Sequence, residues 1–99
     1  MTIRHGSMST DRPDRYAKQL AGHWSRKANV EVVGTTTTIT FDNGQTVRLI
    51  PAAGELQLTV QVPEGGDADR FAQVVADHLQ RFATREELVV TWAPVEAGG

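Results

Sequence analysis

Residues 74–92 read VVADHLQRFATREELVVTW and decide how this chain folds. Up to Phe82 the apolar residues recur every three or four positions, which is the spacing of one face of a helix. After Arg85 they crowd into Leu88–Trp92, a short run typical of a strand. A histidine, His78, lies within the helical stripe, and we therefore expect its side chain to point into the core. The stripe consists of Phe71, Val74, Val75, His78, Leu79 and Phe82.

The segments before this stretch alternate between apolar and polar residues. In Leu56–Val62 the apolar residues are separated by polar ones, which predicts a strand with one buried and one exposed face. Asp42–Gly44 has the backbone freedom of a tight turn, so we expect a hairpin between Ile39–Phe41 and Thr46–Ile50. Residues 30–32, with two valines on one face, predict a further strand before this hairpin.

Two helices flank these strands. Asp11 and Pro13 predict the start of a helix that runs from about Arg12 to Arg26, and Asp67 predicts the cap of a second helix. Because the apolar faces of strands and helices must be buried together, we expect both helices on one face of the sheet. The predicted fold is α+β: a helix, a four-stranded antiparallel meander, a second helix and a final strand.

The length of the chain bounds its domain organisation. With 99 residues it has the size of one compact domain, and we expect a single α+β domain over residues 11–94. Residues 1–10 show neither apolar periodicity nor a targeting pattern, so we expect a flexible N-terminal segment, in which Gly6–Met8 could be an added sequence. Residues 95–99 follow Pro94, and we expect a frayed tail there.

The composition excludes several classes of protein. Hydrophobic residues make up 39% and charged residues 22%, which is typical of a folded globular domain. The absence of cysteine excludes disulfides, thiolate zinc sites and thiol nucleophiles. No apolar run reaches the roughly 20 residues that a membrane helix needs. We therefore expect a soluble cytoplasmic protein that does not contact a membrane.

The formal net charge of -2 hides a split along the chain. Residues 1–28 hold six Lys or Arg and two Asp, whereas residues 29–99 hold four basic and ten acidic residues. We favour a solvated basic face, and the alternative is a surface that docks an acidic partner through Arg12, Arg15 and Lys18. Nucleic-acid binding through the first predicted helix, which carries these basic residues, is a further alternative that we do not favour. Asp67 and Asp69 open the second helix and would repel a phosphate backbone.

The sequence lacks the residue patterns of known catalytic sites. It has no nucleophile elbow, no phosphate loop and no paired acid and base at a recognisable spacing, so we expect no enzyme activity and no cofactor. His23 and His78 are the residues best suited to chemistry, and because the two helices share a sheet face they could meet. A metal site needs three or four ligands, and these two histidines supply only two. We therefore expect two structural histidines and no metal. A histidine-based metal-binding or redox component remains the alternative.

Three blocks of the chain resemble one bacterial family. They are RYAKQLAGHWSRK at 15–27, FDNG at 41–44 and VVADHLQRFATREELVVTW at 74–92. The blocks resemble the domain-of-unknown-function family 2218, whose members are small stand-alone proteins or appended domains. Some members occur beside or fused to siderophore-interacting flavin reductases. The resemblance implies a non-catalytic binding or accessory domain in intracellular siderophore-iron handling, with such a reductase or a small anionic chelate as its partner.

The resemblance also implies which residues bind a ligand. It draws attention to His23, Trp24, Ser25, Lys27, His78, Phe82, Arg85 and Glu86. Where the family commonly reads HWSHK, this chain has Arg26 in place of the second histidine, which puts a shared metal site in doubt and leaves a cation for a carboxylate. The predicted ligand-binding residues are His23, Trp24, Arg26, His78 and Arg85.

Overall fold

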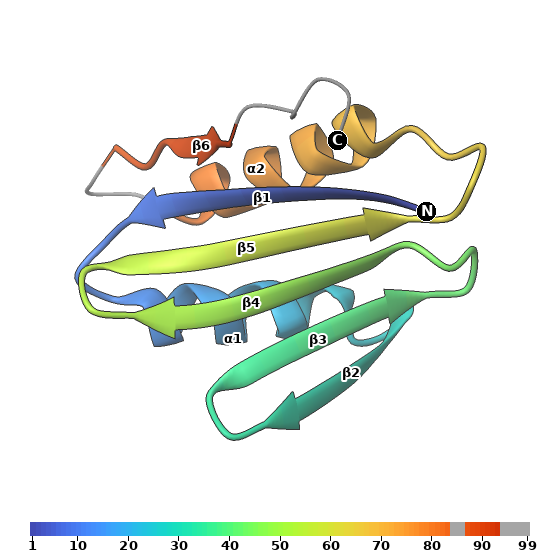
Figure 1. The fold of residues 1–99 in the computed structure, drawn as a ribbon. Helices are drawn as coiled ribbons and strands as arrows, with labels where there is room; N and C mark the ends of the chain where they lie inside the picture. The colour runs from blue at the N-terminus through green and yellow to red at the C-terminus, as the bar shows by residue number, and fades with distance from the viewer. Residues whose placement is uncertain (84–86, 94–99) are drawn as a thin grey trace.

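The computed structural model describes residues 1–83 and 87–93. Along the chain these form β1 (Thr2–Ser9), α1 (Pro13–Trp24), β2 (Ala28–Val33), β3 (Thr36–Phe41), β4 (Thr46–Ala52), β5 (Glu55–Val62), α2 (Ala68–Phe82) and β6 (Val90–Trp92). In this described part the strands make one six-stranded sheet in the order β2-β3-β4-β5-β1-β6, and every neighbouring pair is antiparallel. Both helices cover the same face of the sheet, and the other face is open (Figure 1).

The α+β class holds, but the predicted four-stranded meander with one final strand is wrong in strand number and order. The missing strand is β1, which comes from the segment predicted to be flexible and lies between β5 and β6. On the helix-facing side of β1 only Met8 is apolar and fully buried, because Arg4 and Gly6 occupy the preceding positions. The strand therefore shows no apolar alternation in the sequence. The predicted tail at residues 95–99 lies outside the described residues.

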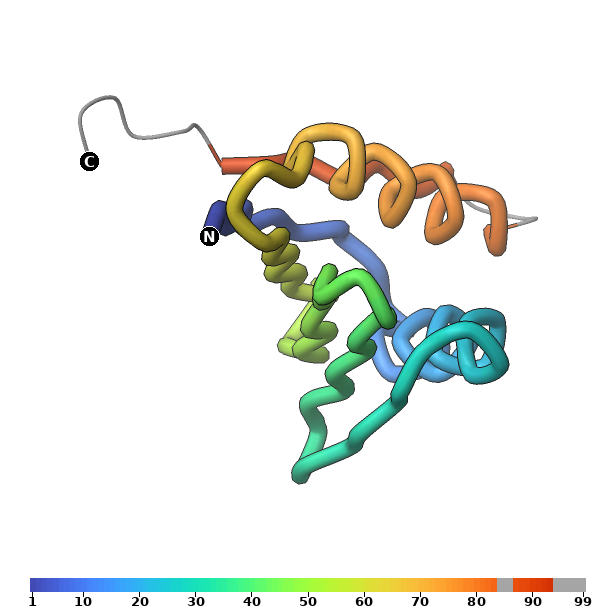
Figure 2. Tube along the Cα trace, turned by 90° about the vertical axis from the view of Figure 1, so that its right-hand side faces the viewer, coloured from blue at the N-terminus to red at the C-terminus, as the bar shows by residue number. Residues whose placement is uncertain are grey.

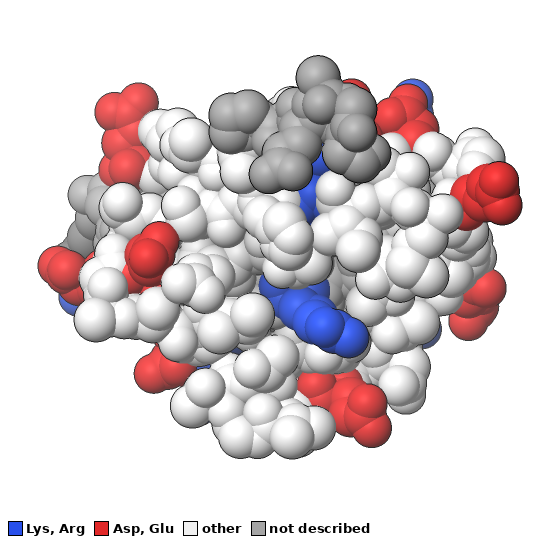
Figure 3. Space-filling view, in the orientation of Figure 1, with Lys and Arg blue, Asp and Glu red and all other residues white. Residues whose placement is uncertain are grey.

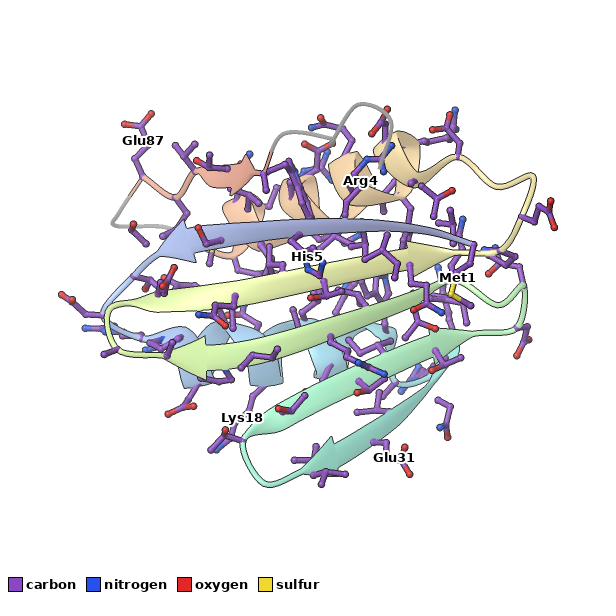
Figure 4. All side chains as sticks on the ribbon, in the orientation of Figure 1. Met1, Arg4, His5, Lys18, Glu31 and Glu87 are labelled. Atoms are coloured by element: carbon purple, nitrogen blue, oxygen red, sulfur yellow. The ribbon has the colours of Figure 1, made fainter. Side chains whose placement is uncertain are left out.

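Gly6 and Arg4 explain how β1 fits without apolar side chains. Gly6 pairs with Trp92 of β6, and a Cβ atom at Gly6 would lie 2.6 Å from Cε3 of that indole. Glycine is therefore required for the indole to lie across β1. Arg4 reaches α2, where its Nε donates to Oδ1 of Asp69 at 3.1 Å (Figure 4).

The hydrophobic core lies between the sheet and the two helices. Each fully buried aliphatic side chain stabilises the fold by roughly 1.5–3 kcal/mol. The residues with the largest fully buried side chains are Met8, Leu20, Ile39, Val47, Leu49, Leu56, Leu58, Val60, Val62, Val75 and Leu79. Val74, which the helical stripe places in the core, is instead 38% exposed.

The two helices differ in how their first turns are capped. Oδ1 of Asp67 accepts a hydrogen bond from the N–H of Arg70 at 3.1 Å, which confirms the predicted cap of α2. The prediction of Asp11 as the cap of α1 is wrong, because Arg12 occupies the N-cap position and makes no side-chain capping hydrogen bond. No helix in residues 1–83 and 87–93 is long and apolar enough to cross a membrane.

Two turns bring distant residues to one end of the molecule, the end that faces the viewer in Figure 2. At the end of α1 the N–H of Lys27 donates to the carbonyl of Trp24 at 3.0 Å. Between β3 and β4 the N–H of Gly44 donates to the carbonyl of Phe41 at 2.9 Å, and Gly44 has a positive φ of 91°. The first part of α2 lies at the same end of the sheet (Figure 1).

Candidate ligand-binding hollow

Trp24 lies at the centre of an aromatic cluster that joins both helices to the sheet. Its ring centroid is 5.1 Å from that of Phe41 on β3 and 4.9 Å from that of His78 on α2. Phe41 in turn contacts Phe71 edge to face, with centroids 5.8 Å apart and planes at 88°. Such pairs contribute about 0.5–1.5 kcal/mol each beyond their buried area, so the cluster fixes its rings in place.

The two histidines meet at the outer edge of this cluster. The ring centroids of His23 and His78 are 5.0 Å apart, and His23 also lies 6.0 Å from the ring of Phe82. His78 is only partly buried, so it does not point into the core as the sequence predicts. Within residues 1–83 and 87–93 no group of three or more His, Asp or Glu is arranged to hold a metal ion.

A hollow of about 320 Å³ opens beside the cluster, and we call it the aromatic hollow. It lies between the end of α1, the β3–β4 turn and the first turns of α2. Its volume is within the range of about 300–1,000 Å³ that is usual for ligand sites. Its lining consists of Trp24, Lys27, Phe41, Gln45, Arg70, Phe71, Val74 and His78.

The lining of the aromatic hollow combines rings with positive charge. Lys27 and Arg70 are both exposed, and within the described part of the chain the lining includes no carboxylate that would neutralise them. A guanidinium can bind a carboxylate through two parallel hydrogen bonds, and an ammonium group binds an anion as a point charge. The aromatic hollow is therefore suited to a small ligand with an apolar ring and a negative charge.

A larger hollow of about 440 Å³ lies on the open face of the sheet. It includes His5, whose Nδ1 lies 3.1 Å from Oγ1 of Thr59, and Figure 4 shows His5 above the middle of the sheet. Among the described residues its lining includes Glu55 and no Lys or Arg, and Arg48 on β4 pairs with Thr59 of this lining. Figure 3 shows this face as largely uncharged, with basic surface near its centre and again toward its upper part, and with acidic groups mostly toward the rim. An anionic ligand is therefore better served by the aromatic hollow.

Sequence comparison places the chain among known proteins. Residues 5–93 match the family described as "Uncharacterized protein conserved in bacteria (DUF2218)". The chain belongs to this family. Because the match begins at residue 5, Gly6–Met8 of β1 are part of the DUF2218 domain, which does not support reading them as an added sequence.

The DUF2218 domain is also similar to a solved structure, "NMR structure of PA4090 from Pseudomonas aeruginosa". The two chains are 32% identical, the comparison covers 97% of this chain and 100% of the other, and the TM-score is 0.70. No curated protein matches the sequence.

The predicted ligand-binding residues divide into three groups in this DUF2218 domain. Trp24 and His78 line the aromatic hollow. His23 contacts the ring of His78 without lining the hollow, and Arg26 is exposed outside it. Arg85 lies outside the described residues.

The predicted docking residues are all exposed. Arg12 precedes α1, while Arg15 and Lys18 lie on it, and Figure 4 shows Lys18 extending outward from the helix.

Sequence reasoning missed most of the hollow's lining, including its two cations. Lys27 belongs to a family block but is not among the predicted ligand-binding residues, and no sequence pattern used above points to Arg70. A signal for Arg70 was present, because Arg70, Val74 and His78 are spaced at four residues and so follow one line along α2 of the DUF2218 domain. The other lining residues that sequence reasoning did not assign to a site are Phe41, Gln45, Phe71 and Val74.

Proposed function

We propose that this DUF2218 domain is a non-catalytic accessory module that binds a small anionic iron chelator in the aromatic hollow and serves a siderophore-interacting flavin reductase. The observation that supports the ligand is the lining of the hollow, which combines rings with Lys27 and Arg70 and includes no carboxylate among residues 1–83 and 87–93. The resemblance of the family to accessories of such reductases supports the partner. Iron chelators commonly combine planar rings with acidic groups, which is the chemistry that this lining would accept.

Charge and burial together set the expected behaviour of this site. Lys27 and Arg70 are exposed, and exposed ion pairs contribute little by themselves because water and salt screen them. Trp24, at 5% exposure, and the partly buried Phe41 supply the apolar contact that a purely ionic site would lack. We therefore expect binding that weakens with added salt and also requires a ring in the ligand.

The position of α1 supports docking of the partner close to the ligand. The basic residues Arg12, Arg15 and Lys18 belong to the first half of α1 and the residue before it, and Trp24 ends the same helix. A helix of this length spans about 18 Å, so a reductase bound along α1 would reach the aromatic hollow. Opposite charge on the partner would mainly accelerate association.

The ligand half of the proposal is tested by titrating the protein with benzoate and with the neutral isostere benzamide, followed by NMR. Benzoate should shift the signals of the aromatic hollow in a saturable way, and benzamide should bind more weakly. Arg70→Glu should remove benzoate binding, whereas Arg81→Glu, an exposed change on the same helix outside the hollow, should retain it. Equal binding of the two probes, or equal losses in the two variants, would contradict the proposal.

The accessory half is tested with a purified siderophore-interacting flavin reductase and a ferric catechol chelate. The wild-type domain should raise the rate of iron release, and the Arg70→Glu domain should not. An unchanged rate in the presence of the wild-type domain would remove the accessory role while leaving the ligand site intact.

A further inference from the structure

The hydrogen bond of His78 fixes the chemistry of its ring. Nδ1 of His78 lies 2.7 Å from the carbonyl oxygen of Val74, one turn earlier in α2. A carbonyl oxygen only accepts, so Nδ1 carries the proton and donates. In the neutral imidazole the other nitrogen, Nε2, then holds a lone pair and accepts a hydrogen bond. Because Nδ1 faces the helix backbone, Nε2 lies on the part of the ring turned away from that backbone.

His78 and Arg70 both line the aromatic hollow and lie far apart along α2. The two residues are eight positions apart on α2, which corresponds to a rise of about 12 Å. Val74 lies between them, and the rings of Trp24 and Phe41 line the same space. A ligand that meets both polar groups must therefore be elongated, with an apolar ring between its polar ends.

We infer that the aromatic hollow selects an aromatic acid with a phenolic hydroxyl at the end of the ring opposite its carboxylate, in the protonated, metal-free form. The carboxylate lies toward Arg70, the ring lies against Trp24 and Phe41, and the hydroxyl donates to Nε2 of His78. This inference rests on the proposed function, because it names the ligand class of the same hollow.

The preference for the metal-free form follows from the proton. A phenol that coordinates ferric iron has lost its proton, so its oxygen has only lone pairs to turn toward Nε2 of His78. Two acceptors that face each other cannot form a hydrogen bond. Each would also lose the hydrogen bond that it makes to water when the ligand is free in solution. The hollow therefore favours the chelator after iron has left it, which would assign the domain to the step that follows iron release.

The first test compares 4-hydroxybenzoate, benzoate and salicylate on the wild-type protein by NMR titration. We expect 4-hydroxybenzoate to bind about three- to tenfold more tightly than benzoate, the factor of one neutral hydrogen bond. Salicylate, whose hydroxyl lies beside its carboxylate, should show no such gain. Equal binding of 4-hydroxybenzoate and benzoate overturns the inference but leaves the anionic site standing. If neither acid binds, the proposed function itself fails.

The second test removes the acceptor. His78→Phe keeps a ring against Trp24 but has no Nε2, so it should bring the affinity for 4-hydroxybenzoate down to that for benzoate. His23→Phe is the matched control, because His23 contacts His78 but does not line the hollow, and it should keep the preference. A preference that survives in His78→Phe, with a melting temperature showing that the variant is folded, contradicts the role of His78.

The third test compares 3,4-dihydroxybenzoate with its gallium(III) complex, a diamagnetic substitute for the ferric complex. The catechol oxygens of this probe lie opposite its carboxylate, so metal binding removes the protons that would meet His78. We expect the free acid to bind and the gallium complex to bind at least several-fold more weakly. Tighter binding of the complex would overturn the metal-free preference and would point to direct contact between Nε2 and the metal.

Discussion

Gly6→Ala is the change whose effect the fold predicts most sharply. The added Cβ would lie 2.6 Å from Cε3 and 3.0 Å from Cδ2 of Trp92, and 3.0 Å from the carbonyl oxygen of Thr91. Overpacking of this kind costs typically about 1–3 kcal/mol. Replacing glycine by alanine also lowers the conformational entropy of the unfolded chain, which stabilises the protein by about 0.4–1 kcal/mol. We therefore expect a net loss of about 1–2 kcal/mol in the free energy of unfolding.

A double-mutant cycle separates this contact from a general intolerance of β1. In a Trp92→Ala background the two indole atoms are absent, and the nearest remaining neighbour of the new Cβ is the carbonyl of Thr91. The cost of Gly6→Ala should then fall below about 0.5 kcal/mol, which leaves a coupling energy of at least about 1 kcal/mol.

Urea denaturation followed by circular dichroism measures the four free energies. Gly22→Ala is the control, because a Cβ there meets nothing within 4 Å and the residue lies in α1, so it should stabilise the protein by up to about 1 kcal/mol. If Gly6→Ala costs the same with and without the indole, Trp92 does not lie over Gly6, and the pairing of β6 with β1 is refuted.

Three further changes test the helices and their residues. Asp67→Ala removes the cap of α2 and should destabilise the fold by about 1 kcal/mol in urea denaturation, and no measurable loss would argue against the cap. His78→Leu removes ring contacts and a local hydrogen bond at a partly buried position, so it should cost about 1 kcal/mol. Zinc or ferrous iron should leave the melting temperature of wild type and of this variant unchanged, and stabilisation of wild type alone would favour the metal-binding alternative. The combined change Arg12→Glu, Arg15→Glu and Lys18→Glu should leave the melting temperature nearly unchanged and weaken binding of a purified siderophore-interacting flavin reductase, with added salt acting likewise on wild type. Unchanged binding at low salt would exclude docking through α1.

The sequence predicts those elements whose apolar spacing is regular. Asp67 and the stripe after it predict α2, and the polar turn between β3 and β4 predicts their hairpin. β1 escapes prediction because its helix-facing side carries Arg4, which pairs with Asp69, and Gly6, which makes room for an indole from the other end of the chain. The strand order cannot be predicted either, because it depends on pairing between segments that are far apart in the sequence and that local periodicity does not connect.

The candidate site divides in the same way. Trp24 and His78 are found through the family resemblance, but their neighbours are not. Lys27 follows the end of α1, and Arg70 lies in the first turn of α2. Only the packing of α1 against α2 brings the two residues to one hollow. Val74 looks like a core residue by spacing, yet it is 38% exposed and lines the aromatic hollow.

The central claim is that the aromatic hollow is the ligand site of this domain, and the two tryptophans test it most directly. Trp24 lines the aromatic hollow, whereas Trp92 lies on β6 beside the hollow of the open sheet face. In an NMR titration of the wild-type protein with 4-hydroxybenzoate, the indole N–H signal of Trp24 should shift and saturate while that of Trp92 stays in place. A titration that leaves the Trp24 signal unmoved, or that moves the Trp92 signal alone, would contradict the claim.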